Sequence, residues 1–253
     1  RLIGGKGQQV MFLSLGDLSG TDARNIICPT LGGDLLYLER GKSGKWNESE
    51  IPLPFGLTAG KGVSITDVNL DGRADLVTTP ESQREAADMI AVAWKENTPD
   101  GWIDHAISDQ HGRKFDRLEM LDLDGDGDLD VVVGHSMVYD TDGDGDISPD
   151  ERRALVRTDT LFFYENIGSA EAPEFVQRTG SENPFAFVDA WGYSSATLGD
   201  LDADGDLDLV LGDDQGELHY YENVKPMATP FVARQAWANP LKMLFDDVSS
   251  CVE

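Results

Sequence analysis

Aspartates recur at every second position between Asp122 and Asp130, and this spacing suits the binding of a hard cation. Side chains at positions 1, 3, 5 and 9 of such a loop can converge on one ion, while glycines let the backbone curl and turn the carbonyl of position 7 inward. Without a cation, the neighbouring carboxylates would repel one another. We therefore predict a calcium loop with ligand positions Asp122, Asp124, Asp126, Asp128 and Asp130.

The same nine-residue loop occurs twice more in the chain. One copy has the predicted ligand positions Asp200, Asp202, Asp204, Asp206 and Asp208. The other has the predicted ligand positions Asp67, Asn69, Asp71, Arg73 and Asp75. An apolar run follows each loop at once, so we expect each loop to lead into a strand.

A degraded copy begins at Asp17. Ser19, Thr21 and Asn25 occupy the next ligand positions, and Asp22 stands where the other loops have glycine. A single carboxylate does little to offset the dehydration of a divalent cation, so we expect this loop to bind metal weakly or not at all.

A different calcium loop is predicted between Asp140 and Glu151. It has acidic residues at positions 1, 3 and 5, Gly145 at position 6, Ile147 at position 8 and a glutamate at position 12, as in an EF-hand. The preceding residues do not have a helical pattern, so we expect a lone loop within an insertion at about 135–158 rather than an EF-hand pair. Its predicted ligands are Asp140, Asp142, Asp144, Asp146 and Glu151, which brings the expected calcium content to three or four ions.

The three aspartate loops and the degraded copy recur along the chain, with a period in the fifties of residues once the insertion is set aside. After each post-loop strand we expect an aromatic strand, at 35–39, 90–94, 161–166 and 218–223, and then a fourth strand that an aromatic residue opens. Four short strands per unit with glycine-rich turns are typical of a propeller blade. The predicted fold is an all-β β-propeller, one domain over residues 1–253, with four-stranded blades at about 8–55, 61–108, 115–180 and 190–238.

These loops and strands resemble the FG-GAP/VCBS repeat family, which includes the integrin α-subunit propeller and many secreted microbial proteins. The resemblance covers about residues 8–240 and implies calcium loops between the first and second strands of a blade. Family propellers commonly have more than four blades. Residues 241–253 are therefore either the start of a further blade in a larger ring of about seven, or the closing strand of a small ring.

The two chain ends carry a more specific prediction. We place the innermost strand of the first blade at residues 8–13. In a larger ring, the faces of the first and fourth blades would not fully cover each other, and Cys28 would not be bonded to Cys251.

Composition excludes several classes of partner. The chain has 47 acidic and 20 basic residues and a net charge of −27, which argues against nucleic acid and anionic membranes as partners. It contains no apolar run long enough to span a membrane. With only two cysteines it is no disulfide scaffold, and its calcium loops favour a calcium-rich compartment that is extracellular, periplasmic or organelle-luminal.

Three functions are compatible with this sequence. The first is a calcium-stabilised, non-enzymatic module for protein interaction, adhesion or scaffolding, because no nucleophile and base form a recognisable constellation and the four histidines do not cluster. The alternatives are a lectin-like carbohydrate-binding propeller and the propeller part of a polysaccharide lyase or hydrolase. Exposure of the tryptophans would favour the lectin, whereas burial would remove it; they are Trp46, Trp94, Trp102, Trp191 and Trp237.

Overall fold

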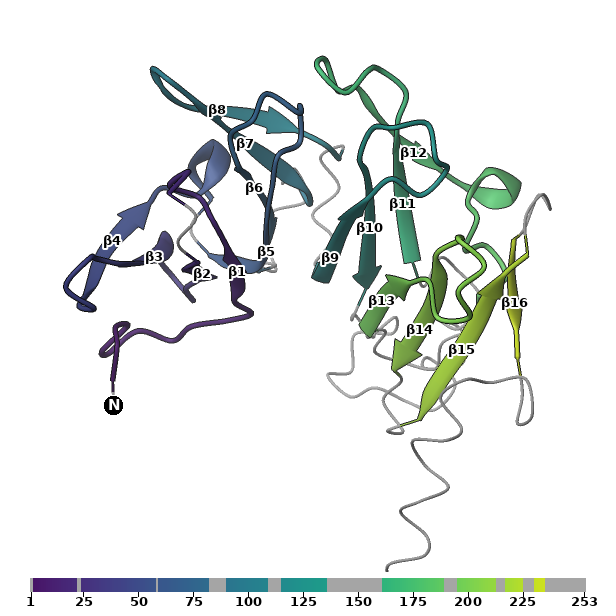
Figure 1. Ribbon diagram of the computed structural model, residues 1–253, viewed down its shortest axis with the longest axis horizontal. Coiled ribbons are helices and arrows are strands. Elements are labelled where there is room, and N and C mark those ends of the chain that lie inside the picture. Colours follow the sequence, from purple (N-terminus) through teal and green to yellow (C-terminus); the bar gives the residue numbers. More distant parts are fainter. Residues whose placement is uncertain are drawn as a thin grey trace, which may run out of the picture. The chain divides into compact units, whose positions relative to one another are not determined.

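The computed structural model describes residues 2–21, 24–57, 59–81, 90–108, 115–135, 161–188, 195–212, 217–224 and 230–234. These residues form an all-β structure of four antiparallel, four-stranded sheets (Figure 1). Two short 3-10 helices, η1 (Pro54–Gly56) and η2 (Gly180–Glu182), lie in the connections. Within these residues, no helix has both the length and the apolar character needed to cross a bilayer.

Each sheet is a meander in which a strand pairs with the next one along the chain. The first sheet contains β1 (Ser14–Gly16), β2 (Asn25–Pro29), β3 (Leu35–Arg40) and β4 (Trp46–Ile51). The second sheet contains β5 (Gly60–Thr66), β6 (Asp75–Pro80), β7 (Ala93–Thr98) and β8 (Gly101–Ala106). The third sheet contains β9 (Phe115–Leu121), β10 (Asp130–His135), β11 (Leu161–Asn166) and β12 (Phe175–Arg178). The fourth sheet contains β13 (Ser195–Gly199), β14 (Asp208–Gly212), β15 (Leu218–Asn223) and β16 (Phe231–Ala233).

This repetition confirms the prediction of four units with four strands each, an all-β and β-propeller-like design. In every sheet the aspartate loop, or its degraded copy, joins the first strand to the second. The apolar runs that follow the loops are the buried second strands, as expected.

The chain divides into two compact units, which are considered separately below. The first unit is Arg1–Val133 with Tyr164–Gln177, and the second is Gly134–Phe163 with Arg178–Glu253.

Within the first unit, the first strands of successive sheets lie side by side, β1 against β5 and β5 against β9. A buried cluster that includes Ile27, Leu35 and Leu76 packs the first sheet against the second. Gly16 is required at this contact, because a Cβ there would lie 2.8 Å from Cγ2 of Ile65. The face-to-face contact of β-sheets therefore supplies the core of this unit.

Three aromatic rings pack together in the second unit. Phe185 is fully buried and stacks on Phe231 with ring centroids 4.8 Å apart, while Phe163 meets it edge-on at 6.3 Å. The buried Asn183 holds this segment in place, since its amide donates to the Leu161 carbonyl at 3.0 Å. Aromatic packing of this kind stabilises by area burial and by ring geometry together.

Two predicted strands have the wrong bounds. The first strand was predicted at residues 8–13 but spans Ser14–Gly16, so the two ranges share no residue. The pairing with β2 shifts register, because Val10 bridges Thr30 whereas Ser14 is opposite Ile27. Such a one-residue shift is a bulge, which interrupts a strand without ending its pairing. The aromatic strand predicted at 90–94 begins only at Ala93 and continues through polar residues to Thr98, because it pairs over that length with β8.

Several predictions fall outside the described residues, including the EF-hand-like loop with Asp140, Asp142, Asp144, Asp146 and Glu151, the ring closure and residues 241–253. Cys28 is a buried free thiol. That it is not bonded to Cys251 stays a prediction, because Cys251 lies outside the described residues.

Candidate metal loops and an aromatic cavity

The last aspartate of each strong loop is buried and ties the loop to the sheet. Asp75, Asp130 and Asp208 are each at most 1% exposed. Each accepts one hydrogen bond from the amide of the second loop residue, at 3.1, 3.2 and 3.0 Å, with Val68, Leu123 and Leu201 as donors. Each accepts another from the third strand, at 2.7, 2.9 and 3.0 Å, with the amides of Asn97, Asn166 and Asn223 as donors. The sequence showed these asparagines only as polar strand ends, so their part in the loop was missed.

Burial has an electrostatic consequence for two of these aspartates. Desolvation raises the pKa of Asp75 to about 6 and that of Asp130 to about 7, although the amide hydrogen bonds act in the opposite direction. A cation in the loop would favour the ionised form of both carboxyls.

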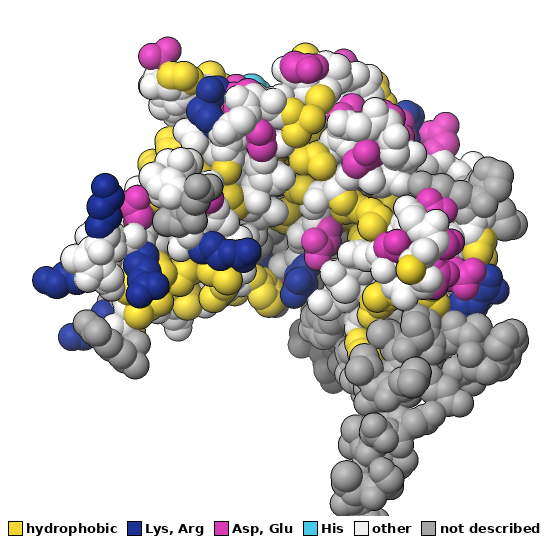
Figure 2. Space-filling view, in the orientation of Figure 1, with side chains coloured by type: hydrophobic (Ala, Val, Ile, Leu, Met, Phe, Trp, Pro, Cys, Tyr) yellow, Lys and Arg dark blue, Asp and Glu magenta, His cyan; other side chains and the backbone are white. Residues whose placement is uncertain are grey.

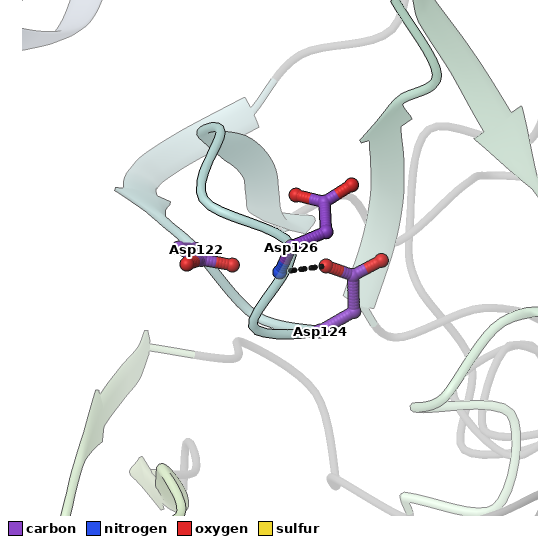
Figure 3. Close-up of side chains that lie close together, drawn as sticks. All are labelled: Asp122, Asp124 and Asp126. Atoms are coloured by element: carbon purple, nitrogen blue, oxygen red, sulfur yellow. Dashed lines mark hydrogen bonds between the residues drawn. The ribbon is translucent and has the colours of Figure 1, made fainter. Parts of the chain in front are cut away.

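The loop from Asp122 to Asp130 brings three predicted ligands together. Carboxylate oxygens of Asp122, Asp124 and Asp126 lie within 4.8 Å of one another (Figure 3). Gly125 and Gly127 have φ of 84° and 98°, a left-handed conformation that lets the loop curl around its own carboxylates. Three exposed or half-exposed carboxylates thus converge within one turn of chain.

Asp128 supplies the observation that bears on a metal. Its side chain is only 7% exposed, and its Oδ1 is buried with no hydrogen-bond partner in the described part of the chain. Desolvation, and then the negative charges of Asp126 and Asp124, raise its pKa to about 6. An unsatisfied buried carboxylate oxygen is costly, and oxygen-only ligands are what Ca²⁺ prefers. The residues of this loop therefore fit a divalent cation, with Asp130 at its base.

The loop from Asp200 to Asp208 gathers a different set. Carboxylate oxygens of Asp200, Asp202 and Asp208 lie within 4.8 Å of one another, while Asp204 instead accepts the amide of Asp206 at 2.9 Å. Asp208 also accepts the Tyr220 hydroxyl at 3.0 Å, and burial with this contact raises the pKa of Tyr220. Asp208, the buried last aspartate that ties this loop to the sheet, is therefore also one of the three converging carboxylates.

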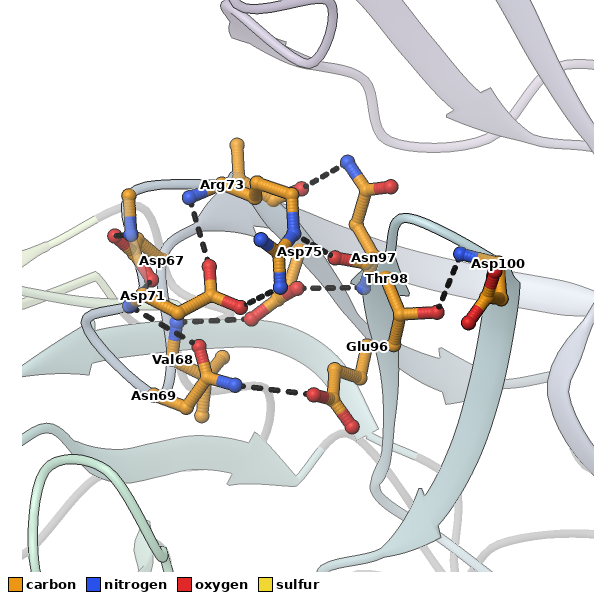
Figure 4. Close-up of polar contacts among 12 residues, drawn as sticks. Asp67, Val68, Asn69, Asp71, Arg73, Asp75, Glu96, Asn97, Thr98 and Asp100 are labelled. Carbon is orange, nitrogen blue, oxygen red and sulfur yellow. Dashed lines mark hydrogen bonds and ion pairs between the residues drawn. The ribbon is translucent and has the colours of Figure 1, made fainter.

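In the loop from Asp67 to Asp75, the side chains at ligand positions bond to other protein groups (Figure 4). The Arg73 guanidinium forms an ion pair with Asp71, and its Nε donates to the Asn97 carbonyl at 2.6 Å. The Asn69 amide donates to Glu96 at 3.1 Å. As a ligand, Arg73 can offer only its backbone carbonyl, and this loop shows no convergence of three carboxylates among its described residues.

In the degraded first loop, hydroxyl and amide groups form hydrogen bonds with the single carboxylate and with one another. Asp17 accepts the Ser19 hydroxyl and the Thr21 amide, both at 3.1 Å, and Asn25 donates to the Ser19 hydroxyl at 3.2 Å. Asn25 replaces the tie aspartate and is fully buried. Unlike the last aspartates of the other loops, Asn25 has a buried Oδ1 with no hydrogen-bond partner among the described residues.

The described tryptophans differ in exposure. Trp94 is buried and stacks on His105, with centroids 4.2 Å apart, and Trp102 packs against the core between the first two sheets. Trp191 and Trp237 lie outside the described residues. Trp46 is half-buried like Trp102 and packs against Cys28, Leu36 and Leu38. It also lines a cavity, which makes it the candidate for ligand stacking.

A cavity of about 470 Å³ adjoins Trp46 on the first sheet. Its apolar lining comes from Leu15, Ile26 and Trp46, and its polar lining from Arg24, Arg40 and Lys42. Lys and Arg side chains gather over this sheet in Figure 2. Trp46 was a candidate from the sequence, whereas the cations were missed. Their signal is local, since Arg40 to Trp46 contains three basic residues and no acidic one in a chain of net charge −27.

The described histidines form no cluster of their own. His105 on β8 pairs with Glu96 at 2.8 Å, whereas His219 lies on β15 in another sheet.

Comparison with known proteins gives a likeness of fold. No family model and no curated protein matches the chain. A solved structure of an Agrocybe aegerita lectin, described as recognising non-reducing terminal N-acetylglucosamine, matches with a TM-score of 0.54 and 15% identity, over 90% of this chain and 52% of the lectin chain. The chain thus spans about half the length of that lectin. At this identity the match shows a shared all-β fold.

Proposed function

We propose that this protein is a carbohydrate-binding module and that the Trp46 cavity is its sugar site. The observation that carries the proposal is a half-buried indole beside an apolar floor with several hydrogen-bond donors at its rim. Sugar rings have apolar C–H faces that stack on aromatic rings, and hydroxyls that need donors and acceptors. A volume of about 470 Å³ falls within the usual size of a ligand pocket, about 300–1,000 Å³.

The fold likeness supports this proposal over the protein-interaction alternative. The matching structure is a lectin, and four repeated antiparallel sheets provide a rigid frame on which connecting loops can present a ligand site. The lectin's sugar is not transferred, because the chain covers only half of it and few residues are identical.

Calcium and the propeller arrangement form a second part of the proposal. We propose that the sheets are blades of an FG-GAP/VCBS-type propeller and that Ca²⁺ stabilises the aspartate loops. The convergence of Asp122, Asp124 and Asp126, together with the unpartnered Oδ1 of Asp128, supports a bound cation. Loops of this type act where calcium is abundant, so we propose an extracellular, periplasmic or luminal location.

A glycan array tests the sugar site directly. Labelled protein in calcium-containing buffer should bind a subset of oligosaccharides, and Trp46→Ala should reduce that binding at least tenfold through loss of stacking. Phe187→Ala is the matched control, because Phe187 is an aromatic residue with 72% exposure that does not line the cavity. If no glycan binds, or if Trp46→Ala binds as the wild type does, the proposed site is wrong.

A further inference from the structure

We propose that the Trp46 cavity selects negatively charged sugars, whose carboxylate or sulfate group is held by Arg24, Arg40 and Lys42. This inference depends on the proposed function, because it assigns a ligand class to the same site.

The cations at this cavity have no ion-pair partners among the residues that the structure describes. Arg24, Arg40 and Lys42 are exposed, and none of them forms an ion pair with another residue that the structure describes. The cavity lining contains no aspartate or glutamate, although the chain has 47 acidic residues in total. Three cations around one hollow, unpaired within the described part of the chain, are therefore a local exception in a strongly acidic protein.

The second sheet provides an internal comparison for these residues. The register and the loop positions make Ile65, Ala74, Leu76 and Trp102 the counterparts of Leu15, Arg24, Ile26 and Trp46. These four counterparts pack against the first sheet. The counterpart of Arg40 is Asn97, which ties the neighbouring loop. In the second sheet, whose face is covered, the two positions hold the neutral residues Ala74 and Asn97. In the first sheet, where Leu15 is 53% exposed, the same positions hold Arg24 and Arg40.

The chemistry of the open face favours an anionic sugar over a neutral one. Guanidinium groups bind carboxylates and sulfates through paired, charge-assisted hydrogen bonds, which a neutral hydroxyl cannot match. The net charge of −27 repels anions in general, so a ligand of this class needs such a cluster. Trp46 can stack the sugar ring while the cations hold its charged group.

Calorimetric titration with matched sugars tests the inference. The probes are oligosaccharides ending in glucuronic acid or in glucose, and N-acetylglucosamine with and without a 6-sulfate. We expect at least one acidic probe to bind tenfold or more tightly than its neutral partner, with an affinity that falls as salt is raised. Arg40→Gln and Lys42→Gln should each remove most of this preference. Lys45→Gln is the matched control, a cation of the same hairpin that does not line the cavity.

The outcomes separate this inference from the proposed function. Equal affinity for acidic and neutral probes, with binding still lost in Trp46→Ala, would overturn the charge preference and leave the sugar site standing. No binding of any probe would overturn both. If no probe binds, and sedimentation shows that the wild type self-associates while Leu15→Glu does not, the face contacts a second copy of the chain instead. A preference for glucuronic acid alone or for sulfate alone identifies which anion the cations select.

Discussion

The loops Asp67–Asp75 and Asp122–Asp130 share a nine-residue pattern but differ in whether a basic residue pairs with their carboxylates. Both hold a buried final aspartate between two backbone amides. In the first loop, Arg73 supplies a positive charge to Asp71. In the second, no basic residue intervenes, three carboxylates converge, and Asp128 Oδ1 has no partner among the described residues.

This difference separates the shape of the loop from its charge. Both loops have positive φ at positions 4 and 6, with Leu70 and Gly72 in one and Gly125 and Gly127 in the other. Both also hold the last aspartate through the same two amide hydrogen bonds, so the shared backbone form does not depend on the charges that differ. Affinity for a cation depends instead on how much negative charge the loop leaves unpaired. The three predictions below test that separation.

The largest effect on the free energy of unfolding is expected from removing the buried last aspartate of a loop. Asp130→Ala leaves the buried amides of Leu123 and Asn166 without an acceptor, which should cost about 2–4 kcal/mol of unfolding free energy. Asp75→Ala should cost a similar amount, because its tie has the same two bonds. Urea denaturation in calcium-free buffer at pH 5 measures this, because the raised pKa of both carboxyls disfavours their ionised forms in the fold at higher pH. Asp100→Ala, at an exposed turn, is the control, and an equally small change in all three variants would contradict the shared tie.

Calcium removal should have the next largest effect. A site with calcium at one hundred times its Kd stabilises the folded state by about 2.7 kcal/mol, so a chelator should lower the melting temperature clearly. Asp126→Asn should shrink the difference between calcium and chelator more than Asp71→Asn does, because Asp71 already has Arg73 as its partner. Melting curves that do not respond to calcium in any of these proteins would exclude a stabilising ion.

The smallest effect concerns Arg73. Its ion pair with Asp71 is partly exposed, with side-chain exposures of 38% and 23%, so the pair competes with a cation by about 1 kcal/mol or less. Arg73→Gln should therefore tighten calcium binding to this loop a few-fold. Calorimetry on Arg73→Gln and on Arg117→Gln, a control arginine on β9, measures this. Weaker binding in Arg73→Gln would show that the arginine supports the site rather than competing with it.

Much of the fold could be predicted because its signals are local. The aspartate loops, the apolar runs after them and the aromatic third strands recur along the chain, and they predicted four sheets of four strands. The limits of β1 and β7 could not be predicted in this way. They depend on a register shift opposite Thr30 and on pairing with β8, which involve residues distant in the sequence.

The candidate sites divide along the same line. Spacing within nine residues identified Asp122, Asp124 and Asp126 as ligands that can converge, because a short loop limits where its side chains can point. Only tertiary structure decided that Asp71 pairs with Arg73, since the spacing allows either a metal or an ion pair.

The sequence by itself determined the repeat, the loops and the strong negative charge, because these follow from residue type and from spacing within a single unit. The cavity was decided by the tertiary structure. Leu15, Arg24, Arg40 and Trp46 are separated along the chain and meet because strand pairing places Leu15 beside Ile26 and Arg40 beside Trp46. The face is covered at Ile65 and Leu76, whereas its counterpart Leu15 is 53% exposed, and this difference arises from the packing of one sheet on another rather than from pairing within a sheet.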